Sequence, residues 1–393
     1  MPQIFRSQRF TFGVIFALGL FSYSNSFHNG FLLDDEQYLL SSPTLNDVSL
    51  VSLFTQAFKG FYRPAAASFL KWELFLFGNH NPAGYHLVNL ILLSVVGWLF
   101  FRIIQKLSQN QQLALLAGVL YAVHPINSLL VNYKTASMIT IGILCMQLGV
   151  LSFLKYVDHG PKRFYMISLL FYFLSLLSSE FSVFLPAFLF LIVYFFRDIK
   201  FGRNILLVAP FFIPFALYGG IRFVVPGIHK IKFFYDLDIN LCQYASTLSQ
   251  LISWYLGKLV FPRDIVFLWD EKIVMPCYAG GAVLGAVALG GLYVVSFLKG
   301  KRNIFAFGAA LSLTGLLPIM AGSFVYTYRT DTVMIEPHWF GFSSIGFFIV
   351  LAGGFLNLKR LIHPKVWGIG LAVLLTVLAF TTRQGNAVWK DDE

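Results

Sequence analysis

The stretch "GYHLVNLILLSVVGWLFFRII", Gly84 to Ile104, runs for 21 residues and holds one basic residue, Arg102, and no acidic residue. A helix of about 20 apolar residues is long enough to cross the hydrocarbon core of a bilayer. The run is continuous, whereas a strand of a membrane barrel would alternate apolar and polar residues. This stretch therefore predicts a transmembrane helix.

The whole chain has the same character. Its 393 residues are 57% hydrophobic and only 12% charged, and the mean hydropathy is +0.71. A soluble domain carries about 25% charged residues. Repeated apolar runs predict an all-α polytopic membrane protein with about eleven transmembrane helices. The expected spans are 10–27, 84–104, 112–130, 136–155, 164–178, 181–197, 204–225, 274–298, 304–321, 339–358 and 366–382.

The basic residues predict the orientation of these spans. Of the 29 Lys and Arg residues, 16 lie at the N-terminus or in alternate short loops, such as Arg6 with Arg9 and the loop 299–303. The positive-inside rule then places the N-terminus in the cytoplasm. Residues 1–382 form the transmembrane domain and residues 383–393 a short extracytoplasmic tail. The membrane is a bacterial inner membrane or the endoplasmic reticulum, and the net charge of +11 reflects topology rather than a nucleic-acid partner.

Two large outer loops result, at about 28–83 and about 222–273. They hold ten of the 18 Asp and Glu residues, so polar chemistry is expected outside. The stretch "LISWYLGKLVFP", residues 251–262, is interpreted as an interfacial or re-entrant helix rather than a further span. Cys145, Cys242 and Cys277 form no framework, and we expect no disulfide.

Three adjacent acids, Asp34, Asp35 and Glu36, stand where the first span meets the outer loop, in "FLLDDEQYLL". One interpretation is a solvated loop start. In another, one carboxylate acts as a general base and its neighbour orients an acceptor or tunes the pKa. The residues alone leave both interpretations open.

Further polar residues lie near the predicted outer ends of the spans. His86 and Asn89 are three positions apart and share one helix face. Glu180 fits a solvated turn. Arg222 fits an interfacial anchor, and its planar fork also suits bidentate phosphate binding. The other candidates are Arg63, His124, Lys134, Glu336 and His338.

The order of these motifs resembles the membrane part of the GT-C glycosyltransferases. It is most similar to the transmembrane O-mannosyltransferases that carry tetratricopeptide repeats, and the resemblance extends over nearly the whole chain. The matching series is Asp34-Asp35, Arg63-Pro64, Tyr85-His86-x-x-Asn89, His124-Pro125, Ser178-x-Glu180, Arg222, Glu336-Pro337-His338 and Arg383…Trp389.

The resemblance implies an inverting glycosyltransferase with a polyprenyl-phosphate sugar donor. The acceptor would be a protein or glycan hydroxyl on the extracytoplasmic face, and membrane lipids would surround the spans. The resemblance implies that Asp34 or Asp35 is the base, with Asp34 preferred and Asp35 as its orienting neighbour. It implies that Arg222 holds the donor phosphate, with Lys258 and Arg263 as the next candidates.

The chain departs from the family pattern at several positions. Leu129 or Leu130 stands about where the relatives have a Glu, Ser179 where a Lys is common, and Pro337 where an Arg usually follows the acid. These departures leave the acceptor open.

Two other functions compete with a transferase. A lipid-linked glycan ligase is the alternative within enzymes. A transporter or flippase predicts ionisable residues at mid-span and a repeated topology, and the sequence has neither. Three carboxylates and His28 lie close in sequence, but their spacing matches no standard ligand set. We therefore expect no cofactor, with a divalent metal left open.

Overall fold

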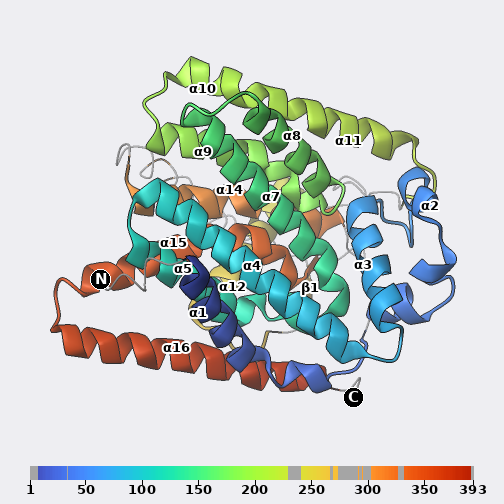
Figure 1. Ribbon diagram of the computed structural model, residues 1–393, viewed down its shortest axis with the longest axis horizontal. Helices are drawn as coiled ribbons and strands as arrows, with labels where there is room; N and C mark the ends of the chain where they lie inside the picture. Colours follow the sequence, from blue (N-terminus) through green and yellow to red (C-terminus); the bar gives the residue numbers. More distant parts are fainter. Residues whose placement is uncertain are drawn as a thin grey trace.

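The computed structural model describes residues 8–32, 34–228, 240–265, 269–272, 291, 294, 302–325 and 332–390. These residues are predominantly helical, as predicted. Figure 1 shows α4 and α7 in the middle of the molecule, α10 and α11 along one edge and α16 along the opposite edge. The α-helices are α1 Gln8–Tyr23, α2 Leu50–Thr55, α3 Pro64–Phe77, α4 Pro82–Ser108, α5 Gln111–Val123, α6 Leu129–Asn132, α7 Ser137–Val157, α8 Arg163–Leu176, α9 Leu185–Phe196, α10 Phe201–Val208, α11 Phe212–Val224, α12 Leu241–Val260, α14 Ile304–Val325, α15 Phe340–Leu358 and α16 Pro364–Asn386.

Short helical turns and one ribbon complete the described chain. The turns include η7 Glu180–Phe184, η10 Pro337–Trp339 and the π-helical segment Glu36–Leu40. The strands β1 Trp269–Lys272 and β2 Thr332–Ile335 pair antiparallel, with Trp269 opposite Ile335. Composition and hydropathy did not predict this ribbon.

Ten of the eleven predicted spans overlap described helices, and the range 274–298 lies almost wholly outside the described residues. Within the described chain, five helices are long and apolar enough to cross a membrane, or six if a bent pair counts as one span. The count of eleven therefore stays a prediction. The five are Pro82–Ser108, Lys134–Val157, Phe201–Val224, Pro337–Leu358 and Pro364–Trp389.

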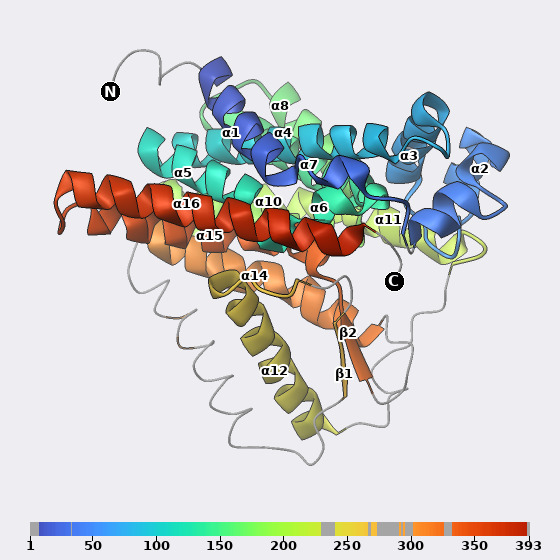
Figure 2. The same cartoon turned by 90° about the horizontal axis from the view of Figure 1, so that it is seen from below.

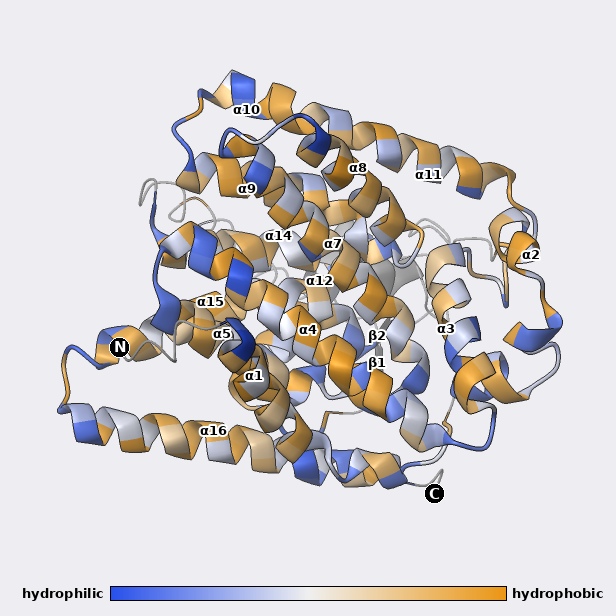
Figure 3. Ribbon diagram, viewed as in Figure 1, coloured by the Kyte–Doolittle hydropathy of each residue, from blue (hydrophilic) through white to orange (hydrophobic). Residues whose placement is uncertain are grey.

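The outer helices expose apolar side chains, and Figure 3 colours much of α11 as hydrophobic. On α11, Ile213 is 61% exposed and Leu217 56%, and on α16 Ile369 is 65% exposed and Val373 56%. Soluble monomers rarely expose apolar surface of this extent. These faces indicate a membrane protein whose outer helices contact lipid.

Small residues let the central helices approach closely. A Cβ atom on Gly118 of α5 would lie 2.8 Å from the carbonyl oxygen of Gly97 on α4, so a larger residue would force the two helices apart. Behind this contact, α5 is bent by 55° from Pro125–Asn132. Pro125 has no N–H and cannot continue the helix. The bend directs the following residues, 131–135, across the ends of α4 and α7.

The stretch 251–262 is part of a longer helix than expected. Asn240 and Gln243 form a capping box, so α12 begins at Leu241. Figure 2 shows α12 and the β1–β2 ribbon projecting from the same side of the bundle. Cys242 in α12 is disulfide-bonded, so the expectation of no disulfide is wrong. Cys277 lies outside the described residues, and Cys145 is a free, buried thiol.

The first outer loop contains an ordered helix, α3, that packs against α7. Pro64 occupies its first turn, and Gly78 ends it with a φ of +65°. Glu73 of α3 is fully buried, and its Oε2 accepts a hydrogen bond of 2.6 Å from the Ser137 hydroxyl at the start of α7. Burial raises the pKa of Glu73 to about 8. Glu73 is therefore mostly protonated at neutral pH.

We predict that Glu73 makes stability depend on pH. Because its folded pKa lies above 4.5, its usual value, the folded state binds more protons than the unfolded state between that value and about 8. The contribution is present below this window and is lost as pH rises through it. Glu73→Gln should flatten the fall in the thermal midpoint, measured in detergent. Glu36→Gln, at an exposed carboxylate, is the control. An unchanged pH profile in Glu73→Gln would contradict this assignment.

Candidate active site

The acidic pair directs its two carboxylates to different surroundings. Asp35 is fully buried, whereas Asp34 is partly exposed. Asp34 accepts a hydrogen bond from the Tyr133 side chain, and its charged neighbours are Glu336, His338 and Arg63. Burial raises the pKa of Asp34, the Tyr133 hydrogen bond lowers it, and the net shift is upward. A carboxylate with a raised pKa accepts a proton more readily than an ordinary aspartate does.

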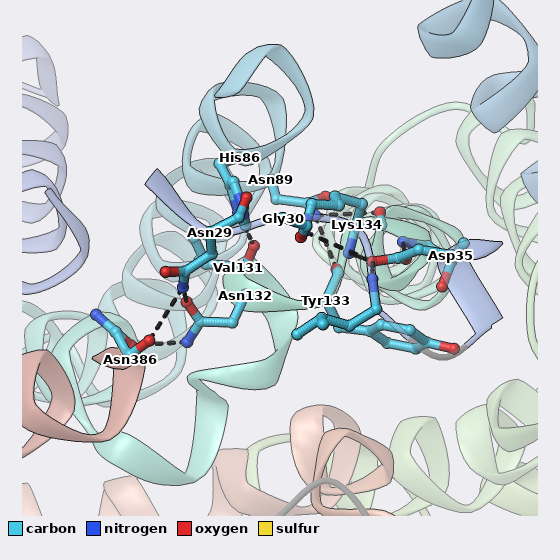
Figure 4. Close-up of polar contacts among 12 residues, drawn as sticks. Asn29, Gly30, Asp35, His86, Asn89, Val131, Asn132, Tyr133, Lys134 and Asn386 are labelled. Carbon is cyan, nitrogen blue, oxygen red and sulfur yellow. Dashed lines mark hydrogen bonds and ion pairs between the residues drawn. The ribbon is translucent and has the colours of Figure 1, made fainter. Parts of the chain in front are cut away.

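Asp35 is bound to the segment that follows the bend (Figure 4). Its Oδ1 accepts the Thr135 N–H at 2.9 Å, and its Oδ2 accepts the Leu32 N–H at 3.3 Å. The ammonium group of Lys134, also fully buried, lies 3.7 Å from Oδ2 and donates to the Gly30 carbonyl. Burial raises the pKa of Asp35 to about 6, against the lowering effect of Lys134. Asp35 and Lys134 therefore anchor the acidic loop.

His86 and Asn89 hold this segment from α4. They lie on one face of the helix, as predicted, and both are fully buried. The His86 ring lies between two carbonyl oxygens, 2.8 Å from that of Val131 and 3.3 Å from that of Asn29. The Asn89 amide donates to the carbonyls of Tyr133 and Lys134 at 3.0 and 3.2 Å. The His86 and Asn89 side chains therefore bind backbone carbonyls of the acidic loop and of the segment after the bend.

Glu180 joins two arginines from distant parts of the chain. Its Oε2 lies 2.8 Å from Nε of Arg63, and its Oε1 lies 2.6 Å from a terminal nitrogen of Arg222. The same Arg222 nitrogen donates to the Tyr218 hydroxyl at 3.0 Å. Burial alone would raise the pKa of Glu180, but the two guanidinium groups outweigh it and hold the pKa below its usual value. Glu180 is thus a partly buried ion-pair residue and not the solvated turn residue that the sequence suggested.

Arg63 links this cluster to the acidic loop. It pairs with Glu180 and is among the charges that act on the Asp34 carboxylate. Glu336 and His338, which also act on the Asp34 carboxylate, form a pair in which Nε2 of His338 lies 3.0 Å from Glu336 Oε2. The His338 ring packs on Tyr133, with centroids 5.7 Å apart. The site therefore combines a carboxylate, an acid–histidine pair and an arginine pair.

The remaining candidates make contacts elsewhere. His124 is buried, with Nδ1 accepting the Ile126 N–H at 3.2 Å and Nε2 lying 3.1 Å from the Leu259 carbonyl of α12. Lys258 donates to the backbone carbonyls of Arg263 and Asp264, and Arg263 is exposed. The contacts described for these residues do not reach Arg63 or Arg222. Across the described ranges, no group of three or more His, Cys, Asp or Glu residues could hold a metal.

Sequence reasoning missed Tyr133 and Tyr218. Both hydroxyls contact residues that were candidates, namely Asp34 and Arg222. Tyr133 directly precedes Lys134, and Tyr218 lies four residues before Arg222 on the same face of α11. That helical spacing was the available signal for Tyr218.

No protein-family model matches the chain, but several curated proteins do. Protein O-mannosyl-transferase Tmtc1 of Drosophila melanogaster is 29% identical over 153 residues, 36% of this chain and 18% of that protein. Protein O-mannosyl-transferase tmtc2 of Xenopus laevis is 31% identical over 165 residues, 39% and 19% of the two chains. Protein O-mannosyl-transferase TMTC3 of Homo sapiens is 31% identical over 117 residues, 27% and 13%.

The chain resembles membrane protein O-mannosyl-transferases. This confirms the similarity inferred from the motif series, over a shorter part of the chain than that series suggested. The aligned stretches span less than a fifth of the length of these relatives. The names of these relatives describe glycosyltransferases.

We predict that Asp35 and Lys134 stabilise the fold only when both are present. Breaking a buried ion pair by removing one partner costs about 3–5 kcal/mol, because a buried charge is left without compensation. Asp35→Asn and Lys134→Met should therefore each lower the unfolding midpoint strongly, measured in detergent. The double variant should recover much of the loss. Losses that simply add in the double variant would contradict the coupling.

Proposed function

We propose that this protein is an inverting glycosyltransferase. Its donor is a polyprenyl-phosphate sugar, and its acceptor is a hydroxyl group of a protein on the extracytoplasmic face. The observation that carries the proposal is that the charge of Arg63 acts on the Asp34 carboxylate, while Glu180 joins Arg63 to Arg222. A proton acceptor thus lies within the electrostatic field of a pair of arginines.

Transfer needs both groups at the same time. The acceptor oxygen forms a bond to the anomeric carbon while the bond from that carbon to the phosphate oxygen breaks. The electron pair of the broken bond leaves with the lipid phosphate, and the acceptor proton passes to Asp34. A hydroxyl has a pKa far above 7, so the base must lie within hydrogen-bond reach of it. The leaving phosphate is stabilised by guanidinium groups.

The charges of the arginine cluster fit this donor. Arg63, Arg222 and Glu180 carry two positive charges and one negative charge, a net charge of +1. The phosphodiester of a polyprenyl-phosphate sugar carries one negative charge, so binding leaves a neutral cluster. Glu180 orients both arginines before the donor arrives, which reduces the ordering cost of binding.

A groove on α11 supports a lipid carrier. It is a shallow, open depression with a volume of about 640 Å³, and its lining includes Leu217, Gly220 and Val224 but not Arg222. The exposed apolar face of α11 suits a polyprenyl chain that remains in the bilayer while its phosphate meets Arg222. The disulfide at Cys242, in the predicted second outer loop, supports an oxidising, extracytoplasmic environment for that loop.

We predict that Asp34 is the base. Asp34→Asn keeps the shape and removes the proton acceptor, so turnover should fall by about 100–10,000-fold while donor binding survives. The assay is sugar transfer from a panel of polyprenyl-phosphate donors to an acceptor peptide. Glu36→Gln, which changes a neighbouring exposed carboxylate, serves as the control and should keep turnover. Near-normal turnover in Asp34→Asn would remove Asp34 from this role.

We predict that Arg222 binds the donor phosphate as a fork. Loss of a hydrogen bond to a charged group costs about 1.5–3 kcal/mol, so Arg222→Ala should raise the donor KM by about 10–100-fold. Arg222→Lys keeps the charge and should be milder. Lys258→Ala is the comparison, since the described contacts of Lys258 are with the backbone carbonyls of Arg263 and Asp264 and with the Trp254 ring. A normal donor KM in Arg222→Ala with a raised one in Lys258→Ala would move the phosphate site to α12.

A further inference from the structure

Arg383 and Asn386, near the end of α16, both bond to the connection that leads from α1 to the acidic loop. The Asn386 amide nitrogen donates to the Ser22 carbonyl at 2.9 Å and to Asn25 Oδ1 at 3.0 Å. The Asn386 carbonyl oxygen accepts from the Asn29 amide at 3.0 Å. Asn386 therefore holds the first part of the connection from α1 to the acidic loop, at Ser22 and Asn25 through its side chain and at Asn29 through its backbone carbonyl.

The Asn386 side chain also binds the segment that carries Tyr133 and Lys134. Its side-chain oxygen accepts a 2.7 Å hydrogen bond from the Asn132 amide, as Figure 4 shows. Asn132 directly precedes Tyr133, which binds Asp34, and Lys134, which binds Asp35. Asn386 is fully buried, so water does not compete for these contacts. One side chain thus links the connection before Asp34 to the segment that carries its hydrogen-bond donor, in addition to the direct contacts of Asp35 with Lys134 and Thr135.

Trp389 packs against the loop that carries the acidic pair. It lies in a small buried cluster with Leu32 and Leu129. Leu32 donates its N–H to Asp35, and Leu129 begins α6, which leads to Asn132. The apolar contact and the hydrogen bonds therefore act on the same two segments.

We propose that Asn386 is a positioning residue for the base. It aligns Asp34 with the reacting hydroxyl from more than 350 residues away in sequence, and Trp389 packs the loop in that position. This inference rests on the proposed transferase activity. The arginine cluster lies on the Arg63 segment, η7 and α11, which Asn386 does not contact. Loss of Asn386 should therefore disturb the base and leave the phosphate site intact.

The experiment separates turnover from donor binding. A misplacement of about 1 Å can cost about 100-fold in rate, so Asn386→Ala should lower kcat by about 10–100-fold. The donor KM and the number of polyprenyl-phosphate sites per chain should stay at wild-type values. Asn386→Asp keeps the shape but turns an oxygen toward the Ser22 carbonyl and the Asn25 oxygen, so its kcat should fall similarly. Gln384→Ala, two positions away on the exposed face of α16, is the matched control and should match the wild type.

A second measurement does not depend on activity. Amide hydrogen exchange across residues 31–40 should become about tenfold faster in Asn386→Ala than in Gln384→Ala, because Ser22, Asn25 and Asn132, on the segments that hold the loop, lose their buried hydrogen bonds to the Asn386 side chain. If the wild-type chain transfers no sugar but this exchange rises, the proposed function fails while the positioning contact stands. Unchanged exchange with a kcat within about twofold of wild type in both Asn386 variants would overturn the inference. A fall in kcat that is fully explained by a loss of donor-binding sites per chain would also overturn the inference.

Discussion

A buried ion pair fixes the geometry of the candidate site. Placing Asp35 and Lys134 out of water costs several kcal/mol for each ion, and the structure offsets this cost with backbone donors from Leu32 and Thr135 and an acceptor at Gly30. Because these partners lie on two different segments, the pair can form only when the acidic loop lies against the chain that follows the α5 bend. Asp34, the adjacent residue, is then held facing Tyr133. The burial of Asp35 therefore fixes the position of the adjacent Asp34 carboxylate.

Charge at the site is shared among groups rather than held by one residue. Arg63 acts on both Asp34 and Glu180, so the proposed base and the proposed phosphate site lie within one electrostatic field. A proton arriving at Asp34 removes a negative charge at the moment when the departing phosphate gains one. The total charge around Arg63 therefore changes little during the reaction. Such a preorganised field needs little rearrangement of side chains, which is the condition under which electrostatic stabilisation is most effective.

The sequence predicted local features well and long-range contacts poorly. The apolar run 84–104 became α4, and the shared face of His86 and Asn89 followed from helical spacing. The candidate residues Asp34, Arg63, Glu180, Arg222, Glu336 and His338 do come together. Their pairing was not predictable, because Arg63 and Glu180 are 117 residues apart and no periodicity encodes that contact. Glu180 was assigned to solvent for this reason. The same limit explains the missed β1–β2 ribbon and the role of His124, whose partner Leu259 is 135 residues away.

The asparagine contacts also order events during synthesis. Ser22 and Asn25 are made early, whereas Asn386 follows 364 and 361 residues later. At a typical rate of 5–20 residues per second, translation of that interval takes roughly 20–70 s. Until Asn386 is made, the connection to the acidic loop lacks its hydrogen bonds to this residue. The helices that carry the arginine cluster have already been made by then. A growing chain would therefore complete the proposed phosphate site before it aligns the proposed base. In that order of synthesis, the contacts of Asn386 form only after α16 has been translated.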